Sequence, residues 1–572
     1  MKTDLILIHA PSVYDFREKS IMFGPMSDLV PSTPIFEMYP IGFLTMTNYL
    51  VRRGLKVRIV NLAYRMLDDK NFNVERFIKK LNPRAFGIDL HWLAHCQGST
   101  EIARIMKECH PETSIIFGGF SSSYFYNELI DFDQVDYILR GDSTEEPLYQ
   151  LMNIIRSGEF SKLGNVPNLV WKDNERVNAN PITNISTDLS EIDFDYRVMF
   201  KQVLNYRDIK SIVPFSDWFR YPITTIPVIR GCSNECSGCG GSKSAFKNFA
   251  CRTKPAFREP GKLIEEIRVI QKHIKSPVFL LGDLNDNGPE YVKEFFKHAS
   301  GLNKDIQMFF EFFRPPDNSF FDMAHEIFSD VCYEMSPDSH DEGIRRKMGK
   351  TFSNKELVDS IKYALGKGSM RFDLYFMTGL PGQTKESIME TVDFCKDIYE
   401  DIGWDKRFMP FISPMAPFLD PGSRAFEDPS KFGYKLTRKS LKDHIEAMTM
   451  PSWKHILNYE SKYVSKDELV DATYGAAMGL NSLKAKAGGI SREVAEMNEE
   501  RIMRASKLMA DIDTIMNAGD EDTRKKKLQR LKEKIHTYSM STVCEKKELE
   551  FPLFNRQFNW FEIIRTTFRR IG

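Results

Sequence analysis

The sequence has 572 residues, enough for about three or four domains of ordinary size. Hydrophobic residues make up 42% and charged residues 28%, which excludes a disordered chain, a collagen and a small disulfide scaffold. Lys+Arg and Asp+Glu both number 79, so the formal net charge is zero and gives no argument for nucleic acid or an anionic membrane as partner. No apolar run approaches the roughly 18 residues of a membrane span.

The nine cysteines are the most informative feature of the composition. An odd number in a long chain with no signal-peptide pattern favours a reducing compartment, and we expect a cytoplasmic protein. The first apolar run, residues 5–8, is too short for a signal peptide and predicts a buried strand. Three of the nine, Cys232, Cys236 and Cys239, lie together on one short segment.

Residues 1–150 alternate between short apolar runs and helix-like stretches. This alternation is typical of a doubly wound, Rossmann-like α/β domain. Because ligands of such sheets bind at the carboxyl ends of the strands, the loops after those ends are candidate binding segments. We expect the strands at residues 5–10, 57–63, 85–91, 114–119 and 135–141.

Residues 151–220 carry scattered Asn, Pro and Asp, and we interpret them as a connector. Strand–helix units return over residues 221–430 and predict a partial (β/α)6 barrel. Its strands are expected at 223–229, 277–281, 307–313, 331–335, 371–377 and 408–412. Residues 431–572 predict a mostly helical C-terminal domain, with expected helices at 438–449, 466–487 and 491–517. Its basic stretch (524–536) is interpreted as a solvated helix face, and its aromatic tail (558–571) as a packing element or a docking helix.

The segment TTIPVIRGCSNECSGCGGS, residues 224–242, places three cysteines as C-x3-C-x2-C directly after a predicted strand. Three thiolates on one loop can each bind one iron of a [4Fe-4S] cluster and leave the fourth iron open to a small chelating molecule. The alternatives are an incidental grouping and a zinc site, whose nearest fourth thiol, Cys251, lies twelve residues further on. Cys251, Cys332, Cys395 and Cys544 are either further ligands or buried free thiols, and because they are widely separated we expect buried free thiols.

The cysteine spacing resembles the radical S-adenosylmethionine superfamily over roughly residues 220–430. The segments VFLLGDLND (278–286), FFEFFRPP (309–316) and GLPGQT (379–384) follow in the order that the family shows. The resemblance implies that the three cysteines bind the cluster and that S-adenosylmethionine is contacted by Asp283, Glu311, Ser336, Asp338 and Arg345. One departure is Gly238, where the family usually has an aromatic residue before the third cysteine, so adenine contacts must come from elsewhere.

The N-terminal segment resembles the cobalamin-binding domain of the cobalamin-dependent radical subfamily at residues 34–63, 115–124 and 135–148. The D-x-H-x-x-G signature, whose histidine binds cobalt, is absent, as is common in that subfamily, and DLHWLAHCQG (89–98) stands instead. Its two histidines are either cobalamin or substrate contacts or ordinary loop and core residues, and a flavodoxin-like domain without cofactor is the alternative for the whole segment. The resemblance implies cobalamin contacts from Pro40, Gly42, His91, Trp92, His95, Gly98, Gly118, Gly119, Phe120, Ser121, Gly141 and Asp142, the last standing where the subfamily usually has Glu.

The resemblance implies an enzyme that uses a [4Fe-4S] cluster, S-adenosylmethionine and cobalamin, like the class B radical methyltransferases. In that chemistry a 5′-deoxyadenosyl radical takes a hydrogen atom from an unactivated carbon, and methylcobalamin delivers a methyl group to it. Within the subfamily, the chain is similar to the archaeal glutamine C-methyltransferase of methyl-coenzyme M reductase, and its helical C-terminal third could dock a protein or peptide.

Two other functions stay open at this point. The same cofactors could serve an oxidase, cyclase or rearrangement enzyme without methyl transfer, or the chain could be a sensor or assembly protein without turnover. The expected partners are a small-molecule, peptide or protein substrate and an electron donor such as ferredoxin or flavodoxin, with no nucleic acid.

Overall fold

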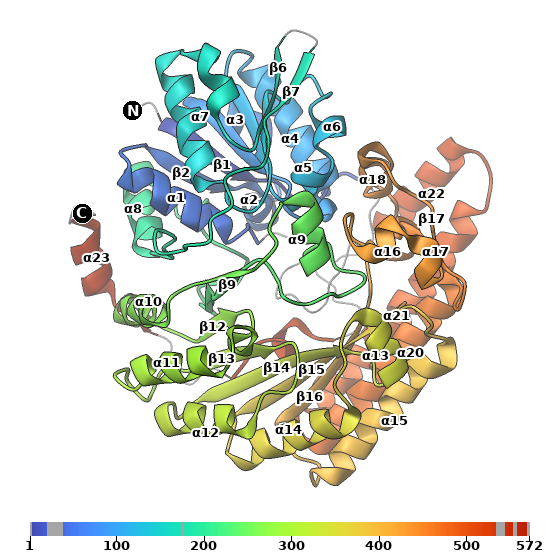
Figure 1. Ribbon diagram of the computed structural model, residues 1–572. Coiled ribbons are helices and arrows are strands. Elements are labelled where there is room, and N and C mark those ends of the chain that lie inside the picture. Colours follow the sequence, from blue (N-terminus) through green and yellow to red (C-terminus); the bar gives the residue numbers. More distant parts are fainter. Residues whose placement is uncertain (1–2, 20–37, 174–175, 534–543, 553–556, 569–572) are drawn as a thin grey trace.

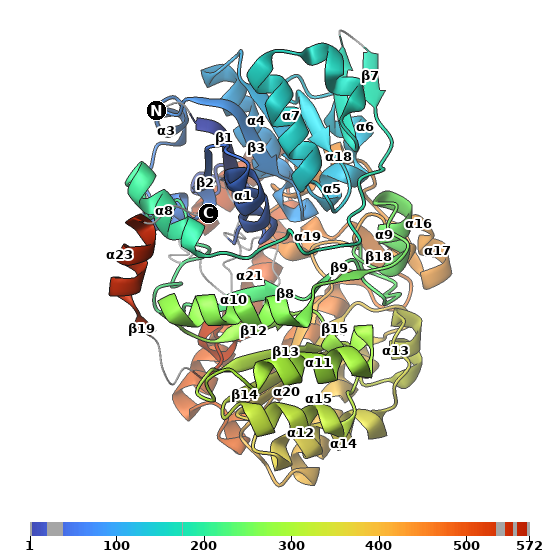
Figure 2. The ribbon, with the colours of Figure 1, turned by 60° about the vertical axis from the view of Figure 1, so that its left-hand side comes forward.

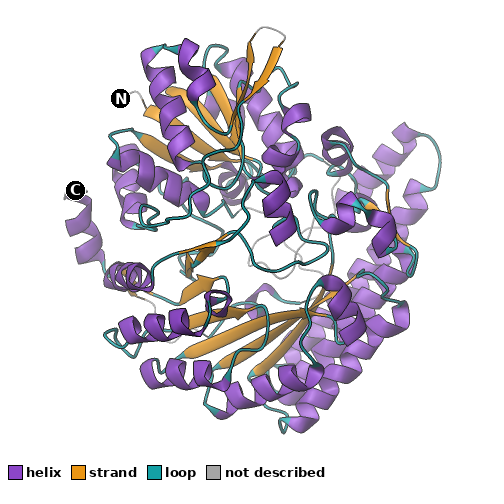
Figure 3. Cartoon of the chain, in the orientation of Figure 1, coloured by secondary structure: helices purple, strands orange, loops and turns teal. Residues whose placement is uncertain are grey.

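The structure is a computed structural model, and it describes residues 3–19, 38–173, 176–533, 544–552 and 557–568. Two separate sheets dominate it, one in the N-terminal region and one in the middle of the chain (Figure 1). Helices lie around both sheets and fill most of the C-terminal third (Figure 3). Part of the segment 34–63 and the ends of the stretches 524–536 and 558–571 lie outside the described residues.

The first sheet has the strand order β2-β1-β3-β4-β5-β6-β7. The strands β1 to β5 run parallel, and β6 and β7 add an antiparallel hairpin at one edge. This hairpin lies in the stretch that we interpreted as a connector, so the first sheet extends to Ala179. The strands are β1 (Thr3–His9), β2 (Val57–Asn61), β3 (Pro83–Asp89), β4 (Ser114–Gly118), β5 (Tyr137–Leu139), β6 (Leu169–Asp173) and β7 (Arg176–Ala179).

Helices cover both faces of this sheet, which explains why β1 and β3 are buried along almost their whole length. Their apolar runs are therefore nearly continuous and do not alternate with polar residues. The helices are α1 (Gly42–Arg52), α2 (Leu62–Asp68), α3 (Val74–Ile78), α4 (Cys96–Cys109), α5 (Phe120–Tyr124), α6 (Tyr126–Leu129), α7 (Glu145–Ser157) and α8 (Arg197–Tyr206).

The second sheet has six parallel strands in the order β16-β15-β14-β13-β12-β8. Within the described residues its two edge strands, β8 and β16, do not pair with each other, so it forms an open barrel. Each strand falls where the sequence predicts one: β8 (Thr224–Pro227), β12 (Val278–Leu281), β13 (Met308–Phe312), β14 (Val331–Asp338), β15 (Arg371–Thr378) and β16 (Phe408–Pro414). The helices that alternate with them are α10 (Pro260–His273), α11 (Pro289–Ala299), α12 (Asn318–Ile327), α13 (Glu342–Met348), α14 (Asn354–Gly366) and α15 (Lys385–Asp401).

The C-terminal third is mainly helical, as the sequence predicts, and α20 packs against α15 and β16 of the barrel. The last described helix, α23, returns to lie beside α8 and α10 (Figure 2). The helices are α16 (Arg424–Glu427), α17 (Pro429–Phe432), α18 (Leu441–Ala447), α19 (Trp453–Ile456), α20 (Lys466–Ala487), α21 (Arg492–Met516), α22 (Glu521–Glu533) and α23 (Trp560–Phe568). Short strand pairs join β9 (Ile229–Arg230) to β10 (Ala256–Phe257), β11 (Ile274–Lys275) to β19 (Gln557–Phe558), and β17 (Tyr434–Leu436) to β18 (Tyr459–Ser461).

Residues 544–552 form a floor under the amino-terminal ends of the barrel strands. The Phe551 ring packs on Phe309, with ring centroids 3.8 Å apart, and belongs to one buried cluster with Cys332. The Arg371 side chain donates hydrogen bonds to the carbonyls of Glu548 and Glu550. The buried Glu548 carboxylate pairs with Lys484 of α20, so the floor is tied to the helical region as well as to the barrel.

Two buried ion pairs join the N-terminal domain to the barrel. The Glu145 carboxylate, at the start of α7, accepts hydrogen bonds of 2.7 and 3.0 Å from Arg230 at the end of β9. The Asp142 carboxylate pairs with Arg252, whose guanidinium also donates to the Ser143 hydroxyl at 3.1 Å. Both pairs connect the loop after β5 to the segment that carries the three clustered cysteines.

Among the described residues, no helix is both long and apolar enough to cross a membrane.

The Asp142–Arg252 pair gives a test of this domain contact. The Arg252→Leu variant should lower the free energy of unfolding by about 3–5 kcal/mol, because it leaves the buried Asp142 carboxylate without its partner. Arg104→Leu is the control, since Arg104 pairs with Glu101 and Glu108 on an exposed helix face and should cost at most about 1 kcal/mol. Urea unfolding measures both, and equal effects of the two variants would contradict the role of the buried pair.

Candidate functional site

The cysteine loop follows β8 and β9 and ends at α9 (Lys243–Phe249). Contacts from two other segments fix it over the carboxyl ends of the barrel strands. The Ser237 amide donates to the Met348 carbonyl at 3.0 Å, and the Ser237 carbonyl accepts from the Ala425 amide at 2.9 Å. Gly231 opens the loop with φ of 94°, a left-handed conformation that favours glycine.

The three thiols face one another closely enough to interact electrostatically. Burial raises the pKa of Cys236 to about 11, and the neighbouring Cys232 also raises it. Burial raises the pKa of Cys239 further, with smaller effects from Asp420 and Cys236. Metal binding requires the thiolate form, which a bound cluster would stabilise against this effect of burial. Three thiols on one loop are a donor set that fits a [4Fe-4S] cluster.

Backbone amides support two of these sulfur atoms. The Asn234 amide lies 3.4 Å from the Cys232 sulfur and the Gly241 amide 3.3 Å from the Cys239 sulfur, and both donate hydrogen bonds. Hydrogen bonds of this kind to cysteine sulfur stabilise negative charge on iron–sulfur clusters and adjust their potential. The cysteine loop therefore offers both ligands and second-layer donors to a [4Fe-4S] cluster.

A mononuclear site is not formed by these residues. Across the described part of the chain, no three His, Cys, Asp or Glu side chains converge in a group that could hold one metal ion. A [4Fe-4S] cluster does not need such convergence, because each cysteine binds a different iron. The geometry therefore does not favour the zinc alternative. Of the other cysteines, Cys332, Cys395 and Cys544 are buried as expected, whereas Cys251 is exposed and corrects that expectation.

Three of the residues predicted to contact S-adenosylmethionine, Asp283, Arg345 and Asp338, form hydrogen bonds or ion pairs with other parts of the protein. Asp283 is fully buried, and its carboxylate accepts from the amides of Asn285 at 2.9 Å and Phe313 at 3.0 Å. The buried Arg345 guanidinium donates to the Ser339 carbonyl at 2.8 Å and to the Phe352 carbonyl at 3.0 Å. These side chains shape the strand ends.

Asp338 is engaged as well, because it forms a buried ion pair with Lys350 at 2.8 Å. Lys350 also contacts the Ser336 carbonyl and lies within electrostatic reach of Cys236 and Cys239. A buried cation beside the cysteine loop offsets part of the negative charge that a thiolate-bound cluster would bring. Lys350 was not among the site residues predicted from the sequence.

Glu311 and Ser336 remain partly open on the barrel strands. One oxygen of Glu311 accepts from the Gly282 amide at 2.8 Å, and burial raises the Glu311 pKa to about 7. Glu334, which the sequence analysis missed, lies beside Glu311 in the parallel register, and burial raises its pKa well above the usual range. The two glutamates stand at the same level of neighbouring strands. Their closeness could have been predicted only with knowledge of how β13 and β14 align.

The predicted cobalamin residues fall into two groups. Several serve packing: His95 is buried and contacts the Ala10 carbonyl at 3.1 Å, and Asp142 is held by Arg252. An added Cβ at Gly98 would lie 1.7 Å from the Pro11 carbonyl oxygen, and at Gly119 it would lie 2.6 Å from the His91 Cα atom, so both positions require glycine.

The second group is less enclosed by the described residues. A Cβ added at Gly118 meets no described atom within 4 Å. His91 is exposed, and Trp92 is 44% exposed, at the carboxyl end of β3. Phe120, the first residue of α5, is half-buried and packs edge-on against Phe246 of α9, with ring centroids 4.9 Å apart. This contact joins the carboxyl end of the first sheet to the helix that directly follows the cysteine loop.

Several exposed residues follow the first sheet or lie in or beside the cysteine loop. His91, Cys239 and Asp420 are exposed, and the surrounding protein lowers the pKa of His91 and raises that of Asp420 to about 6. The Asp420 carboxylate accepts from the Gly240 amide at 3.0 Å, which places it beside the cysteine loop.

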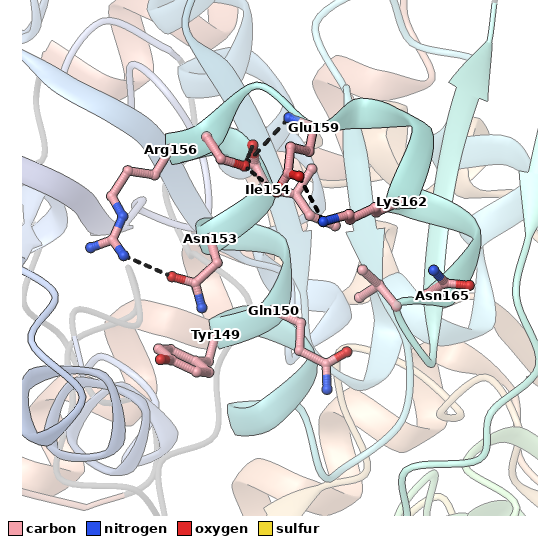
Figure 4. A pocket seen from close by; sticks show the side chains of 10 residues that line it. Tyr149, Gln150, Asn153, Ile154, Arg156, Glu159, Lys162 and Asn165 are labelled. Carbon is pink, nitrogen blue, oxygen red and sulfur yellow. Dashed lines mark hydrogen bonds and ion pairs between the residues drawn. The ribbon is translucent and has the colours of Figure 1, made fainter.

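A surface hollow of about 630 Å³ lies on α7 and the short helix that follows it (Figure 4). Its polar lining forms local interactions such as the Lys162–Glu159 ion pair at 2.6 Å. None of the predicted site residues lines it, so its size does not mark it as the site of the chemistry.

The comparisons with known proteins agree with this geometry. Residues 226–395 match the profile of the Radical SAM superfamily, so the middle of the chain is a radical S-adenosylmethionine domain. Comparison with curated proteins gave no match.

Solved structures extend the similarity to the N-terminal domain. The radical S-adenosylmethionine methyltransferase TsrM from Kitasatospora setae, with cobalamin and a [4Fe-4S] cluster bound, has a TM-score of 0.59 at 14% identity, covering 93% of this chain and 99% of that one. The cobalamin-dependent S-adenosylmethionine radical enzyme OxsB, with aqua-cobalamin and S-adenosylmethionine bound, has a TM-score of 0.54 at 11% identity, covering 99% of this chain and 78% of that one. The chain therefore has the fold of cobalamin-dependent radical S-adenosylmethionine enzymes, which confirms the predicted fold class.

The surroundings of Gly238 leave little space for the aromatic side chain that the family usually has at this position. A Cβ at this position would lie 3.0 Å from the Met415 sulfur, so Met415 occupies the space. We expect Gly238→Phe to lower the iron bound after anaerobic reconstitution, and Gly238→Phe with Met415→Ala to recover part of it. Iron and sulfide assays with the cluster absorbance measure both variants. Full iron content in the single variant would show that the crowding is harmless.

Proposed function

We propose that the chain is a cobalamin-dependent radical S-adenosylmethionine C-methyltransferase that methylates an unactivated carbon. The observation that carries this proposal is the ring contact between Phe120, at the carboxyl end of the first parallel sheet, and Phe246 of α9, directly after the cysteine loop. In open α/β sheets this end is where ligands bind, so a second cofactor bound there would lie near the cluster. The likeness to TsrM, described as a methyltransferase, supports the same choice.

In this proposal Cys232, Cys236 and Cys239 hold the [4Fe-4S] cluster, with the Asn234 and Gly241 amides donating to two of the sulfur atoms. Lys350 places positive charge beside the cluster ligands. When bound, the cluster would supply an electron to S-adenosylmethionine, and cobalamin would carry the methyl group to be transferred.

The barrel strands then offer Glu311 and Ser336 to S-adenosylmethionine, since both are partly open. Asp283, Asp338 and Arg345 are proposed to support the site without contacting S-adenosylmethionine. Their polar groups already bind neighbouring residues and hold the strand ends and loops in place. At the carboxyl end of the first sheet, the proposed cobalamin contacts are His91, Trp92, Gly118 and Phe120. Gly118 fits this role because no atom of the described residues lies within 4 Å of a Cβ built there.

For the methyl acceptor we propose an sp3 carbon of a peptide side chain, with the glutamine of methyl-coenzyme M reductase as the first substrate to test. The support is the resemblance noted in the sequence. The proposed electron donor is a ferredoxin or flavodoxin.

The test is anaerobic turnover of the chain reconstituted with iron, sulfide and hydroxocobalamin, in the presence of S-adenosylmethionine, a reductant and a glutamine peptide. Mass spectrometry should detect 5′-deoxyadenosine, S-adenosylhomocysteine and a peptide heavier by one methylene unit. Cys232→Ala is the control and should lose the cluster and all three products.

The other outcomes separate the alternatives. A peptide that loses hydrogens, with 5′-deoxyadenosine but no S-adenosylhomocysteine, would replace methyl transfer by an oxidase or cyclase activity. Binding of both cofactors without any 5′-deoxyadenosine would favour a sensor or assembly protein.

Gly118 tests where cobalamin binds. Gly118→Leu should reduce the cobalamin retained through gel filtration while the iron content stays unchanged, because the new side chain would occupy the proposed cofactor position without meeting a described atom at its Cβ. Gly164→Leu is the matched control, since its Cβ also meets no described atom within 4 Å and the residue lies in the short helix after α7, outside the proposed site. Unchanged cobalamin in Gly118→Leu would place the binding site elsewhere.

A further inference from the structure

Asp286 carries a buried carboxylate directly beside the cysteine loop. The residue lies in the short helix after β12, Leu284–Asn287, and its side chain is only 1% exposed. Its Oδ2 atom accepts hydrogen bonds from the Ser233 hydroxyl at 2.5 Å and from the Asn234 side-chain amide at 3.2 Å. Ser233 and Asn234 directly follow Cys232 in the chain. The carboxylate therefore binds the loop at the two residues next to its first cysteine.

The Asn234 side chain lies between the Cys232 sulfur and the Asp286 carboxylate. Its Nδ2 atom is 3.8 Å from the Cys232 sulfur, a long hydrogen bond that the large radius of sulfur allows. A side-chain amide has two hydrogens on its nitrogen, so Nδ2 can donate one to the sulfur and the other to Asp286. The Asn234 backbone amide also donates to the same sulfur at 3.4 Å. Cys232 thus receives both of its nitrogen donors from Asn234.

Other segments hold both ends of this contact. The Asn234 carbonyl accepts from the amide of Lys243, the first residue of α9, at 2.9 Å. The Oδ1 atom of Asp286 accepts from Arg314, after β13, at 3.1 Å, while Oδ2 binds the loop. Within the described residues, the Asn234 carboxamide makes hydrogen bonds to Cys232 and Asp286 alone. Asp286 is therefore the group that orients this carboxamide toward the sulfur.

This arrangement bears on electron uptake by a bound cluster. Hydrogen bonds to the sulfur atoms of an iron–sulfur cluster help to set its reduction potential, because they stabilise the more negative, reduced form. We propose that Asp286 is a positioning residue that holds the Asn234 carboxamide against the Cys232 sulfur and so favours the reduced cluster. The charge of Asp286 acts in the opposite direction, since it lies within electrostatic reach of Cys232.

This inference rests on the proposed function, because it requires a [4Fe-4S] cluster on the cysteine loop. It makes the cluster ligands unequal. Cys232 has the two donors of Asn234, whereas Cys239 has the backbone amide of Gly241. The side-chain donor is the one that a distant residue can control, since its direction depends on the acceptor behind it.

The test is a double-mutant cycle on the reduction potential of the cluster. The full chain is reconstituted anaerobically with iron and sulfide and titrated with a reductant, and electron paramagnetic resonance measures the reduced cluster. Asn234→Ala removes the side-chain donor and keeps the backbone amide. At the potential where the unchanged cluster is half reduced, its ratio of oxidised to reduced cluster should be about fivefold higher, the usual effect of one hydrogen bond on an equilibrium.

Asp286→Ala removes both the acceptor and a negative charge, and the cycle separates the two effects. In the Asn234→Ala chain only the effect of the charge remains. Asp286→Ala should therefore change the ratio of oxidised to reduced cluster by a factor about fivefold larger in the unchanged chain than in the Asn234→Ala chain. Asp286→Asn keeps an accepting oxygen and should give equal factors in both chains. Asp322→Ala, on the exposed face of α12, is the control and should leave the potential unchanged.

Equal factors for Asp286→Ala in the two chains would overturn the assignment, because Asp286 would then act through its charge alone. An unchanged potential in Asn234→Ala would overturn it too, since the side chain would then not act on the cluster. If Asp286→Ala does not hold a cluster, Asp286→Leu, which fills the space of the carboxylate, takes its place in the cycle. Loss of the cluster from both variants counts against the assignment, because Asp286 would then serve the folding of the loop.

The failure of the proposed function gives a different result. If the unchanged chain binds no iron and sulfide on reconstitution, the proposed cluster falls, and the role of Asp286 falls with it. If the cluster forms and is reduced but the cycle shows no coupling between Asn234 and Asp286, only the positioning role is lost.

Discussion

The position of the cysteine loop depends on two buried ion pairs between the domains. Arg230, directly before the loop, is held by Glu145, and Arg252, beyond α9, is held by Asp142. Burial alone would raise the pKa of Glu145, but Arg230 lowers it below the usual value, so that pair remains charged. Because a buried charge has no other partner available, each pair admits essentially one geometry. The segment that carries the cysteine loop is thereby held at both ends against the residues that follow β5 of the first sheet.

The sequence predicts the strands and helices well because their signals are local. All six barrel strands appear where apolar runs predict them, and α20 occupies the predicted residues 466–487. The hairpin β6–β7 was not predicted, since its membership of the first sheet depends on pairing with β5, which no local pattern encodes. The cysteine loop could be singled out from the sequence because its three cysteines lie within eight residues of one another.

The polar residues of the site are harder to predict than the cysteines. Asp283 and Glu311 both stand at strand ends, and only the structure shows that Asp283 has both oxygens engaged while Glu311 retains one. The same limit applies to glycines. Gly118 and Gly119 are neighbours and look alike in sequence, yet a Cβ built at Gly118 meets no described atom within 4 Å, whereas one built at Gly119 would touch the His91 backbone. Such differences come from contacts between distant segments, which a single sequence does not reveal.

The floor under the barrel has a consequence for how the protein is made. Phe551 and Glu548 lie far beyond the last barrel strand in the chain, so a ribosome delivers them long after β16. Until then the lower layer around Phe309 and Cys332 has no cover, and Arg371 has no carbonyls from this segment to bind. During synthesis the apolar residues at the amino-terminal ends of the barrel strands therefore stay uncovered until almost the whole chain has been made. The barrel is closed from below only in that last step.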